Sequence, residues 1–174
     1  VLGDVATSER AVVRSIQLFD ESDAVVLGLR ARVMLAELHL AAGRGGAAVA
    51  YLEEVGVVAT ARSLHRLRVT AATGETRALL LDGHVDEAAR RADETLELVL
   101  QVHVSRMDLV NTSVVAARAH AAAGSVDLAI APLEALAADL GDSHSPDFWL
   151  VLEAVRVLGE AGNDPAAFQA WLAR

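Results

Sequence analysis

Cysteine and lysine are both absent from this 174-residue sequence. Without cysteine, the chain can form no disulfide, no thiolate metal site and no cysteine nucleophile. Without lysine, it has no Schiff-base residue and no lysine for a phosphate-binding P-loop. Aromatic residues are scarce at 3%, whereas hydrophobic residues of all kinds reach 53%. A core must therefore be built from alanine, leucine and valine, and the first two of these are strong helix formers.

Positive charge is in deficit as well, because 15 arginines face 24 acidic residues and the net charge is −9. Clustered positive charge supplies most of the affinity for nucleic acids, so direct nucleic-acid binding is disfavoured. No apolar run is long enough for a membrane span, and no basic start followed by an apolar stretch indicates a signal peptide. We therefore expect a cytoplasmic protein. The start at Val1 rather than at methionine suggests a piece of a larger protein.

Glycines recur along the chain with a period of about 40 residues, which indicates an internal repeat. They are Gly3, Gly43, Gly83, Gly124 and Gly162. The last four are each followed five residues later by an alanine, at Ala48, Ala88, Ala129 and Ala167. Glycine tolerates a positive φ and can end a helix in a left-handed cap. A small residue suits the next helix, because antiparallel helices are closest near a short connection. The unit is therefore typical of a helical hairpin.

Hydrophobic periodicity supports helices on both sides of these turns. Residues 26–42 carry two apolar faces, which predicts an inner helix packed between neighbours. Residues 85–99 carry a single apolar stripe beside many charges, which predicts an outer helix with a solvated face. Ser105 and Asp108 resemble a capping box, and Pro132 should kink its helix or weaken its first turns. The expected helices are 6–20, 23–42, 46–58, 63–82, 85–102, 106–123, 126–140, 146–161 and 165–173.

The pattern resembles the tetratricopeptide repeat. Leu35, Ala36, Gly43, Ala48 and Leu52 match the large, small, turn, small and bulky positions of that family's helix pair. The copy before Gly83 departs from the pattern, with Glu75 and Thr76 at the large and small positions. The resemblance implies an all-α solenoid of antiparallel helix pairs, wound as a right-handed superhelix over 1–174. The repeat at 1–22 would be incomplete.

The period of about 40 is longer than the 34 of the standard repeat. It resembles the repeats in large LuxR-type bacterial transcription regulators, where such an array sits beside ATP-binding and DNA-binding domains. HEAT-like repeats have a similar period, but the glycine followed by alanine five residues later favours the tetratricopeptide reading. The resemblance implies a non-catalytic protein- or peptide-binding scaffold within a larger regulator, with no cofactor. Fold alone does not fix function.

Candidate binding residues follow from repeat-equivalent positions on the first helices, which line the concave face in that family. Arg77, Arg118 and Arg156 share one position, where Glu37 stands in the first copy. Three arginines in register would suit an acidic peptide or an anionic ligand. The alternative is that each arginine pairs with a neighbouring acid or is simply solvated. Asn111 and Trp149 share a second position, where they would contact a partner or pack between helices.

Other functions find less support in the sequence. A small-molecule sensor with an anionic inducer in the concave groove is the main alternative to a protein-binding scaffold. The six histidines include no closely spaced pair, so neither a metal site nor catalysis is predicted. Four of the six aromatic residues lie within the last 30 residues, which fits a packing cluster or a contact patch. Exposed ends of a solenoid tend to associate, so we also expect a homo-oligomer.

Overall fold

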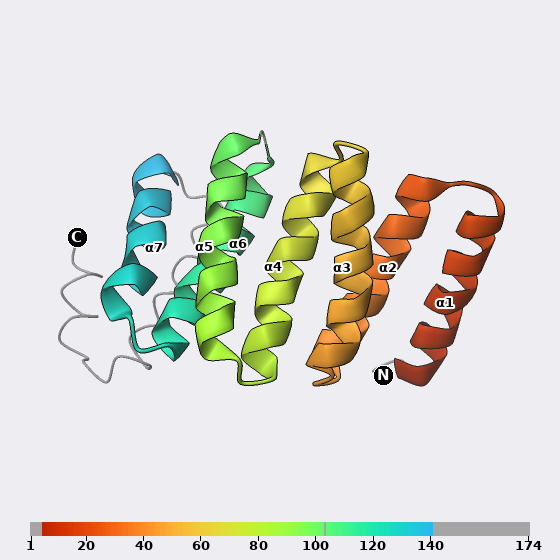
Figure 1. Cartoon of the computed structure of the whole chain (residues 1–174), viewed down its shortest axis with the longest axis horizontal. Helices are drawn as coiled ribbons and strands as arrows, with labels where there is room; N and C mark the ends of the chain where they lie inside the picture. The colour runs from red at the N-terminus through yellow and green to blue at the C-terminus, as the bar shows by residue number, and fades with distance from the viewer. Residues whose placement is uncertain (1–4, 103, 141–174) are drawn as a thin grey trace. The chain divides into compact units, whose positions relative to one another are not determined.

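A computed structural model describes residues 5–102 and 104–140, and all regular structure in this part is α-helical. The order is α1 (Val5–Glu21), α2 (Val25–Ala41), α3 (Gly45–Ala61), α4 (His65–Leu81), α5 (Val85–Gln101), α6 (Arg106–Ala122) and α7 (Val126–Leu140). The first six helices each have 17 residues. Successive helices alternate in direction, as the first four show in Figure 1. The prediction of an all-α array of antiparallel helix pairs is confirmed.

The predicted bounds of the first seven helices lie within two residues of those in the structure, except at the end of α3. We expected this helix to end at residue 58, but it continues to Ala61. Gly56 lowers helix propensity, yet Ala59 beyond it is fully buried, and this packing holds the last turn in place. Helix α7 continues through Pro132. The helices expected at 146–161 and 165–173 lie outside the described residues.

The turns after α1, α2, α3 and α6 share one hydrogen-bonding pattern, in which the middle residue is left-handed. Gly43, Gly83 and Gly124 have φ values of 74°, 80° and 76°, as predicted for helix-ending glycines. After Gly43, for example, the Arg44 amide donates to the His39 carbonyl, while the Gly43 amide donates to that of Leu40. This is a Schellman motif. The carbonyl of Arg44 then accepts the first helical bond of α3, from Ala48, so one residue closes one helix and opens the next.

Side-chain capping is confirmed at the start of α6. Ser105 Oγ accepts a hydrogen bond from the Asp108 amide, and the Ser105 amide donates to the Asp108 carboxylate. The link before α6 is longer than the other links, and Ser105 has an extended backbone rather than continuing from a left-handed turn. A capping box stabilises such an isolated helix start by satisfying two otherwise unpaired amides.

The chain divides into two compact units, and the first ends at Gly83 in the sequence. In the first unit, α2 packs against α1, α3 and α4. Leu35 joins Val12 of α1 in one buried cluster, and Leu29 joins Val55 and Ala71 of α3 and α4 in another. The two apolar faces predicted for this segment therefore both find partners. In the second unit, Val110 and Ala117 of α6 pack against Ala129, Leu133 and Leu136 of α7.

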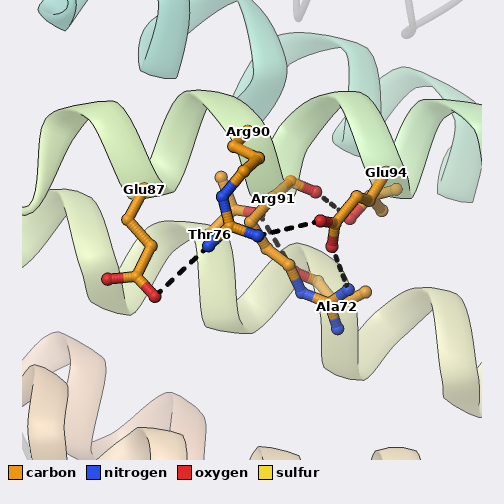
Figure 2. Close-up of polar contacts among 7 residues, drawn as sticks. Ala72, Thr76, Glu87, Arg90, Arg91 and Glu94 are labelled. Atoms are coloured by element: carbon orange, nitrogen blue, oxygen red, sulfur yellow. Dashed lines mark hydrogen bonds and ion pairs between the residues drawn. The ribbon is translucent and has the colours of Figure 1, made fainter.

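Helix α5 is amphipathic, as its single apolar stripe predicted. Its buried residues are Ala88, Ala92, Thr95, Leu98 and Val99. On the exposed side Arg90 lies between Glu87 and Glu94, and Arg91 also contacts Glu94 (Figure 2). Such surface pairs contribute little stability individually. Their presence marks this face as solvated.

Thr76 shows how the first unit accommodates a polar residue at a position where the family has a small apolar one. Its side chain is 1% exposed, and its hydroxyl donates to the carbonyl of Ala72, one turn earlier in α4 (Figure 2). The internal hydrogen bond removes the cost of burying an unpaired hydroxyl. The departure from the repeat pattern at this position is therefore compatible with the fold.

None of the helices within the described residues is both long and apolar enough to span a membrane.

Candidate functional site

The structure places three of the predicted binding residues. Arg77 lies on α4 and forms an ion pair with Glu37 of α2, with 2.6 Å between Nη1 and Oε1. Glu37 and Arg77 are repeat-equivalent, so α2 and α4 bring one pair of equivalent positions into contact. Arg118 and Asn111 are exposed on α6, in the second unit. Arg156 and Trp149 lie outside the described residues.

A groove of about 550 Å³ lies between α2 and α4 in the first unit. Its walls include Val26, Arg30 and Val33 from α2, and His65, Leu67 and Thr70 from α4. Arg30 and Thr70 are repeat-equivalents of Asn111 and Trp149. In the first unit, therefore, the two positions equivalent to Asn111 and Trp149 line a groove.

The groove combines an apolar floor with a basic rim. Val33 and Leu67 are partly buried, whereas Arg30 and His65 are exposed. Arg30 forms no ion pair with any residue that the structure describes, unlike Arg77 with its Glu37 partner. The Thr70 hydroxyl donates to the carbonyl of Arg66, so it is already satisfied. The arrangement suits a ligand with both an apolar group and a carboxylate.

An ion-pair network links α1, α2 and α3. It was not predicted from the sequence. Arg32 of α2 donates from Nη1 and Nη2 to both carboxylate oxygens of Asp20 on α1, at 3.1 and 2.8 Å. Its Nε lies 2.8 Å from Oε1 of Glu54 on α3. The Arg32 side chain is only 14% exposed. The three residues lie 12 and 22 positions apart, so helical periodicity alone could not have joined them.

Close to this network, His39 stacks on Tyr51. Their ring centroids are 5.6 Å apart and the planes differ by 7°. Nδ1 of His39 is buried without a hydrogen-bond partner, and Oε1 of Glu9 lies 4.0 Å away. Glu9 itself pairs with Arg44. The ring of Tyr51 is thus held by stacking against a neighbouring helix, and it fills space between α1 and α3.

The hydrogen bond from Arg32, and to a smaller extent its positive charge, lower the pKa of Asp20 against an opposing effect of desolvation. A carboxylate whose pKa is lower in the folded than in the unfolded chain contributes stability above the unfolded pKa of about 3.9. That contribution is lost as the pH falls through the folded pKa. We expect Arg32→Met to flatten the decline of unfolding free energy below about pH 4.

Urea unfolding followed by circular dichroism over a pH series measures this effect. Asp20→Asn should flatten the same part of the profile, whereas Arg90→Met on the exposed side of α5 should leave its shape unchanged. Parallel profiles for the wild type and Arg32→Met would contradict the proposed linkage.

Within the described residues, no cluster of three or more histidine or acidic side chains could hold a metal ion.

Comparison with known proteins adds information on the fold. The chain matches no protein-family model and no curated protein sequence. Two crystal structures are similar, both of nearly identical TPR-like repeats from a kinesin light chain-like protein of Podosopora anserina, one being a single-residue variant. Their TM-scores are 0.76 for the variant and 0.74 for the other. Each is 20% identical, and the alignments span 98% of this chain and 84% and 85% of those chains. The chain has the TPR-like repeat fold. At this identity the likeness concerns the fold alone.

Proposed function

We propose that this TPR-like chain is a non-catalytic scaffold that binds an acidic, partly apolar peptide or protein segment in the groove between α2 and α4. The observation that carries the proposal is the exposed Arg30 beside the apolar floor of Val33 and Leu67. The chain as a whole is strongly acidic, so a local basic rim would select the acidic segment by charge as well as by shape.

The longer repeat supports a setting in a larger bacterial regulator of transcription, as in the LuxR-type proteins that it resembles. In that setting, the partner would be either another protein or another domain of the same polypeptide. Arg118 and Asn111, which are exposed on α6 of the second unit, are further candidates for partner binding, as are Arg156 and Trp149 on the basis of the sequence alone. Exposed apolar side chains on α1, such as Val13 and Leu18, support self-association at the end of the array.

A selection of random peptides displayed on phage against the purified chain tests the function. We expect enrichment of peptides with aspartate or glutamate close to a leucine or an aromatic residue. For a synthetic peptide from this set, Arg30→Glu should weaken binding about 10- to 100-fold, since a hydrogen bond to a charged group contributes roughly 1.5–3 kcal/mol. Binding should also weaken with added salt.

Arg14→Glu provides the matched control, because it makes the same charge change on the exposed side of α1, away from the groove. Equal losses for Arg14→Glu and Arg30→Glu would contradict a specific role for the groove. Arg77→Glu and Arg118→Glu test whether the predicted arginine row takes part. If no peptide is enriched, but small dicarboxylates raise the melting temperature in an Arg30-dependent way, the groove is an anionic-inducer site instead.

A further inference from the structure

In the first unit, side chains of α1, α2 and α3 fill the space between these three helices. Tyr51 packs against apolar residues of α1 and stacks on His39 of α2. Arg32 reaches across to Asp20 of α1 and Glu54 of α3. An aromatic stack and an ion-pair network thus close the space together.

The second unit repeats the same three-helix arrangement with different side chains. Helices α5, α6 and α7 begin 80, 81 and 81 residues after α1, α2 and α3. His39 of α2 therefore corresponds to His120 of α6, and the imidazole is kept. The other side chains that close the first unit are replaced. Arg32, Asp20, Glu54 and Tyr51 correspond to Ser113, Leu100, Ala135 and Pro132.

These replacements leave a cavity of about 440 Å³ between α5, α6 and α7. Ser113, His120, Leu100, Ala135 and Pro132 all line it, so the positions that fill the first unit form the walls here. The rest of the lining is almost entirely apolar. Leu100 and Leu128 at this cavity are 85% and 57% exposed, so its apolar wall continues to the surface.

A few buried polar groups face this apolar space. Ser113 is 2% exposed, and its hydroxyl forms no hydrogen bond with the described residues. His120 is 4% exposed, and its Nε2 donates to Oδ1 of Asp93 at 2.8 Å, which fixes the ring orientation. A hydroxyl in the wall of an apolar cavity can bond to a polar group of a ligand or to water. An apolar cavity with a few placed polar groups is the usual composition of a small-molecule site.

We propose that this cavity binds a small planar aromatic molecule that carries one hydrogen-bonding group. The ring stacks on the imidazole of His120, as Tyr51 stacks on His39 in the first unit, and the polar group bonds to the hydroxyl of Ser113. Leu100, Leu128 and Pro132 enclose the edges of the ring. A small molecule fits better than a partner side chain, because Ser113 is almost wholly buried at the bottom of the cavity. The site is separate from the peptide groove of the first unit.

Indole is a suitable probe because it is flat and has a single N–H donor. Titration of the whole chain, followed by NMR chemical shifts, should give saturable binding with a dissociation constant on the order of 0.1–1 mM for so small a ligand. Pro132→Tyr should abolish binding, because the new ring occupies the cavity as Tyr51 does. Pro132→Ala is the matched control, since it also removes the proline but leaves the cavity open, and it should retain binding.

The hydrogen bond to Ser113 has a test of its own. Ser113→Ala removes only the hydroxyl and should weaken indole binding about 2- to 10-fold, the usual net effect of one hydrogen bond. Indene, which has the same shape but no N–H, should bind equally to the wild type and to Ser113→Ala. The proposal is overturned if Pro132→Tyr binds indole as well as Pro132→Ala does. It is also overturned if the wild type shows no saturable binding up to the solubility limit of indole.

Discussion

Replacement of Gly74 by alanine should destabilise the first unit by roughly 1–3 kcal/mol, although alanine is the better helix former. Gly74 lies in the middle of α4, where a Cβ atom would come within 2.9 Å of Cδ2 and 3.0 Å of Cδ1 of Leu52 on α3. Leu52 is 1% exposed in a core cluster, so its side chain has little room to move. The overpacking should therefore outweigh the gain in helix propensity.

Replacement of Gly56 of α3 by alanine should have the opposite effect to that of Gly74 in the neighbouring α4. A Cβ at Gly56 would meet its nearest atom, Oε1 of Glu75, at 3.7 Å, which is an ordinary contact. Gly56→Ala should therefore stabilise the chain by about 0.5–1 kcal/mol through helix propensity. The two variants make the same chemical change in helix interiors, and they differ only in the space around the new methyl group.

A double-mutant cycle connects the effect of Gly74→Ala to Leu52. Leu52→Ala alone should cost about 2–5 kcal/mol, because it removes a buried side chain and leaves a cavity. In that background Gly74→Ala should become neutral or stabilising, since the methyl group enters the vacated space. Urea unfolding measured by far-UV circular dichroism gives all four free energies. If Gly74→Ala costs the same with and without Leu52, the close contact is not the cause.

The two glycines show where sequence analysis reached its limit. A glycine inside a helical pattern predicts reduced local stability, and in this respect Gly56 and Gly74 look alike. They differ in what lies opposite on the neighbouring helix, and this depends on the rotation of α3 against α4. Periodicity assigned the faces of these helices correctly, but it does not give interatomic distances between facing residues.

The helix ends could be predicted because the recurring glycine is a local signal. A left-handed residue closes a helix through bonds to carbonyls only a few positions away, so neighbouring residues determine the outcome. Asp23 and Ser63 end α1 and α3 in the same way, with φ values of 52° and 55°. They were missed as markers, because neither aspartate nor serine indicates a positive φ as strongly as glycine does. When these two residues are counted with the glycines, the chain shows a period of about 20 residues, which corresponds to one helix and one turn.

The candidate sites depend on contacts between residues far apart in the sequence, so they could be predicted only in part. Repeat equivalence placed Glu37 and Arg77 in one row, and the ion pair between them corresponds to the alternative in which an arginine of the row pairs with a neighbouring acid. Position 30, by contrast, is occupied by an arginine with no ion pair to a described residue, in a row for which the sequence left partner contact and helix packing open. The cavity beside His120 was found only by comparing the two units. In the first unit Tyr51 and Arg32 fill the equivalent space, and in the second unit other residues replace them and leave it open.

Substitution of the glycines in the left-handed turns should also reduce the stability of the chain substantially. Gly43→Ala, Gly83→Ala and Gly124→Ala should each destabilise the chain by about 1 kcal/mol, because a Cβ atom is strained at these φ values. No heavy atom outside the local backbone lies within 4 Å of a Cβ built at any of the three positions, so collisions with neighbouring side chains do not contribute. The three sites lie in separate turns, so the triple variant should lose about 3 kcal/mol.

Ser63→Gly should have the reverse effect and stabilise the turn between α3 and α4 by up to about 1 kcal/mol, since it relieves the strain of serine at φ 55°. Asp23→Gly should gain less, because aspartate tolerates the left-handed region better than serine does. Gly43→Asn should likewise lose less than Gly43→Ala. Thermal and urea unfolding would measure this order. Equal stability of Gly43→Ala and Gly43→Asn would show that backbone strain at the turn does not control the stability of the array.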